Sequence, residues 1–209
     1  MRLILASSSP RRRALLEALG FRFEVVPPGV DEPKPPGLPP ARLVEELALH
    51  KALAVAGRLG AAGESAWILG ADTVVVLDGE ILGKPADAAE AVRMLRRLAG
   101  RTHLVYSGIA LLAPGAGREP SARVARVAHR RTEVHLRPLR AGEAERYVAT
   151  GEPMDKAGAY AVQGLGAVLV EWIHGDYTNV VGLPVPLLLE SLEGLAEPGG
   201  LRGPEGEGG

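Results

Sequence analysis

Two periods of apolar and polar positions run along the chain, which indicates that it forms both strands and helices. Short apolar runs that end at glycine, proline or a polar turn have the length of buried strands, whereas apolar residues three and four apart indicate helices with one buried face. The expected strands cover residues 2–6, 22–26, 67–77, 80–82, 103–113, 124–136 and 167–173. The expected helices cover residues 10–19, 41–57, 141–150 and 186–195, with one more between Asp87 and Gly100.

The order of these elements predicts a mixed α/β sheet with flanking helices, because helices alternate with strands while hairpins interrupt the alternation. Asp78-Gly79 predicts a tight hairpin turn. Asp87, with Glu90 three residues later, predicts a capped helix start. Charges that alternate along residues 124–136 indicate a solvated sheet edge. One domain is expected over residues 1–196, followed by a flexible C-terminal tail over residues 197–209.

Composition excludes several classes of protein. The 209 residues carry 24 Lys+Arg against 25 Asp+Glu, and this balance argues against a partner that is a nucleic-acid polymer. The absence of cysteine excludes disulfides, thiolate metal sites and a cysteine nucleophile. No apolar run reaches the roughly 20 residues that span a bilayer, and the N-terminus is too short for a signal-peptide core. A soluble cytoplasmic protein without a membrane partner is therefore expected.

The segment Ala6-Ser7-Ser8-Ser9-Pro10-Arg11-Arg12-Arg13 is the first candidate site, at a turn from strand to helix. Ser9 suits the N-cap position and Pro10 the first helical position. Three arginines at the positive end of a helix dipole are unfavourable unless an anion binds there. Free N–H groups, hydroxyls and guanidinium groups would together cradle a phosphate. An ordinary capped helix with solvated arginines fits the same residues equally well.

Asp72 lies in the middle of the apolar run Gly70–Val76 and is the second candidate. A lone buried carboxylate is costly, so Asp72 must be paired, hydrogen-bonded or bound to a metal. The hairpin at Asp78-Gly79 folds Lys84 back along the partner strand, which predicts that this ammonium lies near Asp72. The two side chains would suit a metal-and-phosphate site, although a structural ion pair is also plausible. Pro85 stands where a P-loop has Ser or Thr.

Two further segments are rich in polar residues. Residues 152–166 (EPMDKAGAYAVQGLG) contain the only glutamine, Gln163, in a run whose glycines are typical of loops; a dinucleotide-binding fingerprint is rejected because the third glycine is missing. Residues 176–184 (DYTNVVGLP) contain the only asparagine and fit a simple helix cap better than a site. Only four of the cations are lysines, and a lysine kept among so many arginines indicates that a compact ammonium is needed.

Three long segments together closely resemble the Maf family of nucleoside triphosphate pyrophosphatases: LILASSSPRRRALLEALG, GADTVVVLDGEILGKPADAAEAVRML and GEPMDKAGAYAVQGLGAVLVEWIHGDYTNVVGLP. The resemblance runs from Arg2 to about Leu192 in the same order and spacing. It implies a twisted mixed sheet in two lobes around a central cleft, similar to inosine-triphosphate pyrophosphatases. It also implies hydrolysis of a nucleoside triphosphate to the monophosphate and pyrophosphate with a divalent cation, Mg²⁺ or Mn²⁺.

The family's functional positions can be carried over residue by residue. Its proton acceptor falls on Asp72, and the serines and arginines of its ASxSPRR motif fall on Ser7, Ser9, Arg11 and Arg12. Its acidic position after the second strand falls on Glu32, beside Asp31, and its two lysines fall on Lys51 and Lys84. The resemblance thus implies that Asp72 and Glu32 hold the metal, while the cations neutralise the phosphates.

The branch of the family that acts on dTTP and UTP is distinguished by an Arg after SP, a Thr after GAD and a Gln in YxxQG. Arg11, Thr73 and Gln163 match all three positions. A glutamine amide presents a donor beside an acceptor, as the edge of uracil or thymine requires. The expected function is therefore hydrolysis of pyrimidine or modified nucleoside triphosphates. The alternatives are a pyrophosphatase for 7-methyl-GTP or another purine nucleotide, and a nucleotide-binding regulator of septum formation. A homodimer is left open.

Overall fold

A computed structural model describes residues 2–30 and 37–193. The expected tail over residues 197–209, and Asp31 and Glu32 in the proline-rich loop, lie outside the described residues. The strands are β1 (Leu3–Ala6), β2 (Phe23–Val25), β3 (Trp67–Leu77), β4 (Glu80–Leu82), β5 (Thr102–Leu112), β6 (Val124–Leu136) and β7 (Val170–His174). The helices are α1 (Pro10–Ala18), α2 (Pro40–Leu59), α3 (Ala88–Leu98), α4 (Glu143–Ala149), α5 (Tyr177–Val181) and α6 (Val185–Glu193). Short 3-10 segments are η1 (Gly60–Gly63), η2 (Pro120–Arg123), η3 (Glu152–Asp155), η4 (Ala157–Ala159) and η5 (Gly164–Leu169).

The strands form one mixed sheet in the order β2-β1-β3-β5-β6-β7, with β4 paired to β3. β1 runs parallel to β2 and β3, whereas the remaining pairs are antiparallel. The expected mixed α/β sheet is therefore confirmed. β7 pairs with β6 only from Glu133 to Leu136, so within the described part of the chain the first two thirds of β6 form a sheet edge, as the alternating charges predict.

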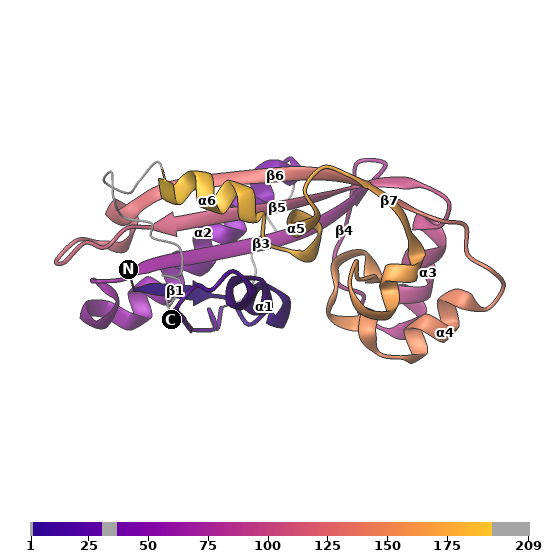
Figure 1. The fold of residues 1–209 in the computed structure, drawn as a ribbon, viewed down its shortest axis with the longest axis horizontal. Helices are drawn as coiled ribbons and strands as arrows, with labels where there is room; N and C mark the ends of the chain where they lie inside the picture. Colours follow the sequence, from indigo (N-terminus) through magenta and orange to yellow (C-terminus); the bar gives the residue numbers. More distant parts are fainter. Residues whose placement is uncertain (1, 31–36, 194–209) are drawn as a thin grey trace, which may run out of the picture.

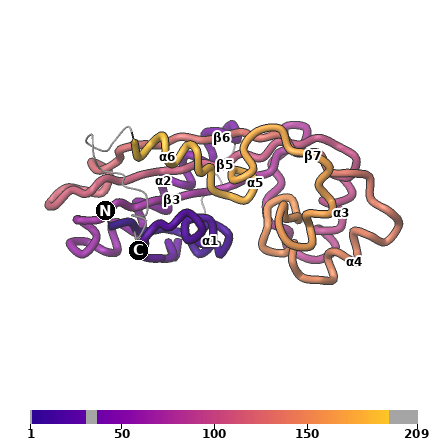
Figure 2. Tube along the Cα trace, viewed as in Figure 1, coloured from indigo at the N-terminus to yellow at the C-terminus, as the bar shows by residue number. Residues whose placement is uncertain are grey.

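The molecule has two lobes joined by the long strands β3, β5 and β6 (Figure 1). In the first lobe, α2 covers one face of the sheet, and α1 and α6 cover the other. The second lobe contains α3, α4 and the 3-10 segments η3 to η5, which pack around the other end of the strands (Figure 2). Its core includes Met94, Leu95 and Leu98 from one face of α3.

Two glycines let α2 lie directly on the sheet. A Cβ at Gly70 of β3 would be 2.0 Å from the carbonyl oxygen of Ala48, and a Cβ at Gly108 of β5 would be 2.4 Å from that of Val44. The helix backbone therefore contacts the strand backbones without an intervening side chain. This contact fixes where the residues of α2 meet those of β3.

Most expected elements begin and end within two residues of their predicted bounds, and β3 and the hairpin to β4 match them completely. The expected strand over residues 167–173 is wrong in its first half, because η5 extends to Leu169 and β7 begins only at Val170. The chain turns there since Gly164 has a positive φ of 66° and the next two amides donate to the side chain of Glu152. Within residues 2–30 and 37–193, none of the helices combines the length and apolar character that crossing a membrane requires.

Candidate active site

Several of the candidate residues lie at an unpaired stretch of one edge of β3 or are bonded to the residues there. On this edge β1 pairs with β3 up to Gly70, and β4 pairs with it from Val75 onward. Among the described residues no strand covers the edge between these two positions, where Asp72 and Thr73 lie. The opposite edge of β3 is paired with β5 from Ile68 to Val76. Ser7 follows the end of β1 and Lys84 follows the end of β4, so the chain brings residues to this opening from both sides.

Asp72 points toward α2 and is paired there with Lys51. The Lys51 Nζ donates to Asp72 Oδ1 at 2.5 Å, and both side chains are more than nine-tenths buried. Asp72 faces α2 because it lies two residues beyond Gly70, and alternate residues of a strand share one face. The expectation that a buried Asp72 must have a partner is confirmed. The ammonium that the structure shows bonded to it is that of Lys51 and not that of Lys84, which is exposed beyond β4.

Thr73 points to the opposite face, where it contacts Arg12. The guanidinium of Arg12 is buried and donates from Nε to the carbonyl of Gly182 at 2.7 Å, from one terminal nitrogen to Ser7 Oγ at 3.1 Å and from the other to Thr73 Oγ1 at 3.1 Å. Ser107 of β5 lies 2.7 Å from Thr73 Oγ1 and donates to the carbonyl of Asn179. The guanidinium of Arg12 is therefore held in a fixed orientation beside Ser7.

The N-terminus of α1 differs in detail from the expected cap. Ser9 is the N-cap residue and Pro10 begins the helix, but the Ser9 side chain makes no capping hydrogen bond. Instead, the amide of Ser9 donates to Ser7 Oγ at 3.2 Å. Ser7 thus orders both the turn and the Arg12 guanidinium, while Arg13 is exposed and paired with Glu17. Of the three arginines, Arg13 fits the alternative of a solvated side chain.

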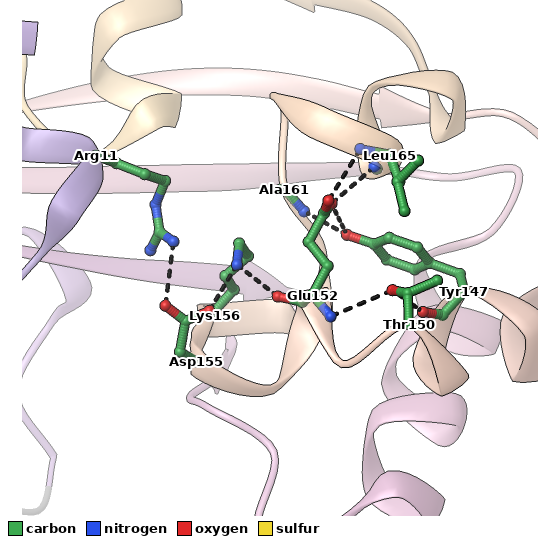
Figure 3. Close-up of polar contacts among 9 residues, drawn as sticks. Arg11, Tyr147, Thr150, Glu152, Asp155, Lys156, Ala161 and Leu165 are labelled. Carbon is green, nitrogen blue, oxygen red and sulfur yellow. Dashed lines mark hydrogen bonds and ion pairs between the residues drawn. The ribbon is translucent and has the colours of Figure 1, made fainter. Parts of the chain in front are cut away.

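Arg11 reaches from the first lobe to the second (Figure 3). Its guanidinium lies 3.3 Å from Asp155 Oδ2, whose other oxygen accepts a hydrogen bond from Lys156 Nζ at 2.6 Å. Burial raises the pKa of the Asp155 carboxyl group. The hydrogen bond from Lys156 and the positive charges of Lys156 and Arg11 together lower this pKa by more than burial raises it, so it lies below its usual value. One ionised carboxylate therefore bridges the two lobes.

Gln163 lies in the second lobe, immediately before η5, and its side chain is exposed. Near it, Glu152 accepts hydrogen bonds from the amides of Leu165 and Gly166 and from the Tyr147 hydroxyl (Figure 3). Burial raises the pKa of Glu152, yet these hydrogen bonds outweigh it and hold the pKa below its ordinary value. Burial and the Glu152 carboxylate raise the pKa of Tyr147, which therefore stays a hydroxyl.

The donor set near Asp72 fits a metal that is shared with phosphate oxygens. Within the described ranges, no three His, Cys, Asp or Glu side chains are grouped to hold an ion. Mg²⁺, however, is commonly bound through one or two carboxylates together with substrate phosphates and water. Asp72 supplies one such carboxylate, and Glu32, the second expected ligand, lies outside the described residues.

The structure also identifies supporting residues that the sequence analysis did not select. Ser107, Asn179 and the carbonyl of Gly182 orient Thr73 and Arg12, and Asp155 contacts Arg11. Ser107 shares with Asp72 the signal of a polar residue within an apolar strand, which could have been used to find it. Asp176 caps α5, as expected, through the amides of Thr178 and Asn179. The site as a whole combines one carboxylate with several oriented cations, which suits hydrolysis of a phosphate anhydride.

The sequence of this chain is similar to the sequences of known proteins. The sequence profile of the family described as Maf-like protein matches residues 2–195. A dTTP/UTP pyrophosphatase from Pelotomaculum thermopropionicum is 52% identical over 191 residues, which cover 91% of this chain and 95% of that protein. A dTTP/UTP pyrophosphatase from Moorella thermoacetica is also 52% identical over 191 residues, covering 91% of this chain and 93% of that protein.

The fold is also similar to that of a solved structure. The Staphylococcus aureus Ham1 protein superimposes with a TM-score of 0.51 over 94% of this chain and 100% of that chain, with 15% sequence identity. At this identity the likeness concerns the fold alone. It agrees with the mixed sheet and flanking helices described above.

Proposed function

Because the chain belongs to the Maf family, we propose that it is an enzyme that hydrolyses dTTP, UTP and related pyrimidine nucleoside triphosphates to the monophosphate and pyrophosphate. The observation that carries this proposal is the buried Asp72–Lys51 pair at the open edge of β3, with the oriented guanidinium of Arg12 on the opposite face of the same strand. The relatives named dTTP/UTP pyrophosphatase support the choice of pyrimidine substrates. Arg11, Thr73 and Gln163, which carried the resemblance to this branch, support it as well.

The proposed reaction is attack of water on the α-phosphorus. The water oxygen bonds to that phosphorus while the bond to the oxygen bridging to the β-phosphate breaks, and pyrophosphate leaves with the electron pair. The Asp72 carboxylate orients the water and takes its proton, and Lys51 holds the carboxylate in position. Arg12 and Arg11 neutralise charge on the phosphates, with Ser7, Ser9 and Lys84 as further phosphate ligands. Mg²⁺ or Mn²⁺, held by Asp72 and Glu32, would supply additional charge neutralisation when bound.

Base selection is assigned to the second lobe. Gln163 presents its amide to the uracil or thymine edge, while Thr73 and Arg11, the other two positions that distinguish this branch, lie in the first lobe on the side of the phosphates. The substrate would thus lie between the lobes, with its phosphates near α1 and its base near η5. A cytoplasmic location and a homodimer, both considered from the sequence, stay predictions.

A screen for pyrophosphate release tests the proposal. The purified protein is incubated with Mg²⁺ or Mn²⁺ and each common nucleoside triphosphate, including 7-methyl-GTP, and release from dTTP and UTP is expected. Release from purine nucleotides alone would favour the purine-directed alternative. Binding of nucleotides without release would favour the regulator of septum formation.

Asp72→Asn tests the assigned role of the carboxylate. The amide has the same shape and keeps one oxygen for Lys51, so the fold should persist while turnover falls below detection. Asp78→Asn is the matched control, since Asp78 is an exposed turn residue with a φ of 53°, a conformation that Asn tolerates. Retained turnover in Asp72→Asn, with the control also active, would refute the role of Asp72.

A further inference from the structure

The backbone that carries Gln163 is fixed on its N-terminal side by Tyr147. The Tyr147 hydroxyl accepts a hydrogen bond from the amide of Ala161 at 3.1 Å and donates to Glu152 Oε1 at 2.8 Å. Tyr147 is 7% exposed, and its bond to the Ala161 amide is buried, whereas its bond to Glu152 is partly buried. The chain is therefore held two residues before Gln163 by a hydroxyl that a second side chain orients.

On the C-terminal side, Glu152 holds the same segment. Its Oε2 accepts from the amide of Leu165 and its Oε1 from the amide of Gly166, both at 2.9 Å. Hydrogen bonds of backbone amides to an ionised carboxylate are stronger than those between neutral groups. Figure 3 shows the Glu152 carboxylate and the Tyr147 hydroxyl side by side beneath this turn. Gln163 thus lies between two anchored points of the chain.

Local structure brings Tyr147 and Glu152 together across the end of α4. Gly151, with a φ of 77°, reverses the chain after the helix. Thr150 Oγ1 donates to the carbonyl of Tyr147 and accepts from the amide of Glu152 at 3.2 Å. The two side chains are consequently placed by the turn itself, independently of Gln163.

The glycines on either side of Leu165 fit this arrangement. A Cβ at Gly164 would lie 2.6 Å from Glu152 Oε2, and a Cβ at Gly166 would lie 2.4 Å from the Tyr147 hydroxyl. Gly164 also has a φ of 66°, and a Cβ at Gly166 would lie 2.5 Å from the carbonyl oxygen of Ala161. Glycine at these two positions therefore lets the backbone approach Tyr147, Glu152 and Ala161 closely.

Resting on the proposed function, we propose that Tyr147 and Glu152 are positioning residues for base selection. Together they fix the backbone on both sides of Gln163 and so restrict where its exposed amide can meet the base. They are expected to act on the discrimination between bases, because they contact the segment that carries Gln163 and not the Asp72–Lys51 pair. A substitution that removes the hydrogen bonds of either Tyr147 or Glu152 to this backbone should widen the range of bases that Gln163 accepts.

The test compares kcat/KM for UTP and CTP in the wild type, Gln163→Ala, Glu152→Gln and Tyr147→Phe. In Glu152→Gln the amide group cannot accept from one of the two backbone N–H groups, and Tyr147→Phe removes the hydroxyl. Each of the three variants should lower the UTP preference by about tenfold, the loss expected from one oriented hydrogen bond. The loss should appear in the KM for UTP with kcat nearly unchanged. Amide hydrogen exchange over residues 161–166 should speed up in Glu152→Gln and Tyr147→Phe.

Glu171→Gln and Tyr177→Phe are the matched controls, because both residues are exposed and lie outside the Gln163 segment. Both should keep the wild-type preference. If the wild type releases no pyrophosphate from UTP or dTTP, the proposed function fails. If it does, and Glu152→Gln and Tyr147→Phe keep the wild-type preference, the positioning role is overturned while the function stands. Equal loss of kcat with every nucleotide would likewise overturn it, since that result marks general destabilisation.

Discussion

Replacing Gly70 by alanine should both destabilise the protein and disturb its Asp72–Lys51 pair. The added Cβ would lie 2.0 Å from the carbonyl oxygen of Ala48 and 3.0 Å from the backbone nitrogen of Ala52. These are backbone atoms of α2, so no side-chain rotation relieves the contact. The helix must retreat from the sheet by roughly 1 Å to reach even the tightest observed spacing of 3.0 Å.

The size of the destabilisation by Gly70→Ala follows from the packing of α2 on the sheet. Overpacking a core costs about 1–3 kcal/mol, and a contact between two backbones belongs at the upper end of that range. For a chain of this size, a loss of about 3 kcal/mol lowers Tm by roughly 6–12 °C. Lys51 follows Ala48 by one helical turn and Asp72 follows Gly70 by two residues. The same displacement therefore lengthens the 2.5 Å contact between Lys51 Nζ and Asp72 Oδ1.

Thermal unfolding measures the loss of stability, and pyrophosphate release measures the effect of the disturbed Asp72–Lys51 pair on activity. Gly57→Ala is the control, because Gly57 is an exposed residue of the same helix with open space around its missing Cβ. That substitution should raise stability by about 0.5–1 kcal/mol through the higher helix propensity of alanine and leave activity unchanged. A Gly70→Ala variant with wild-type Tm and activity would refute the argument that a backbone contact places α2.

Three further results are expected. Burial, and to a lesser extent the charge of His135, lowers the pKa of His103 to about 4. Between about pH 6.5 and pH 4, His103 therefore binds a proton in the unfolded chain but not in the folded chain. Stability should therefore fall on the order of 3 kcal/mol from pH 6.5 to 4, and denaturant titrations of His103→Gln should lack this slope; an unchanged slope would contradict the assignment. Arg12→Lys keeps the positive charge, but a lysine cannot donate to Gly182, Ser7 and Thr73 at the same time, so kcat/KM should fall about 100-fold. Arg13→Lys, at an exposed position, should leave kcat/KM unchanged. Asp155→Asn removes the carboxylate that pairs with Arg11, so Arg11 becomes available to the substrate phosphates. At low salt the KM for UTP should fall by up to about fivefold, and the free energy of unfolding should change by less than about 1 kcal/mol. A higher KM would refute competition between Asp155 and the substrate for Arg11.

The elements of the sheet were predictable because their signals are local. The apolar run of β3, the Asp78-Gly79 turn and the Asp87 cap each lie within a few residues of the structure they specify. The sequence pattern predicts a strand at residues 167–169, which belong to η5, because the turn of η5 depends on Glu152, 13 and 14 residues before the two amides that it binds, and on no pattern of its own. An apolar segment next to a strand then reads as part of that strand.

The contacts among the candidate site residues could be predicted much less well than the strands of the sheet. The sequence presents Arg11, Arg12 and Arg13 as equivalent, whereas the structure buries Arg12, extends Arg11 to the second lobe and leaves Arg13 in solvent. Lys84 was expected next to Asp72 because a hairpin joins them, yet the bonded partner, Lys51, comes from a helix 21 residues earlier. That pairing depends on the close approach of α2 at Gly70 and Gly108, which a sequence does not reveal.

Asp72 and Thr73 are neighbours in sequence but belong to opposite faces of β3, one turned toward Lys51 and the other toward Arg12. Their order along the chain therefore matters as much as their identities. Exchanging the two residues would present a hydroxyl to the lysine and a carboxylate to the arginine. Composition and net charge would be unchanged by the exchange, yet the polarity of the site would be reversed across the thickness of a single strand.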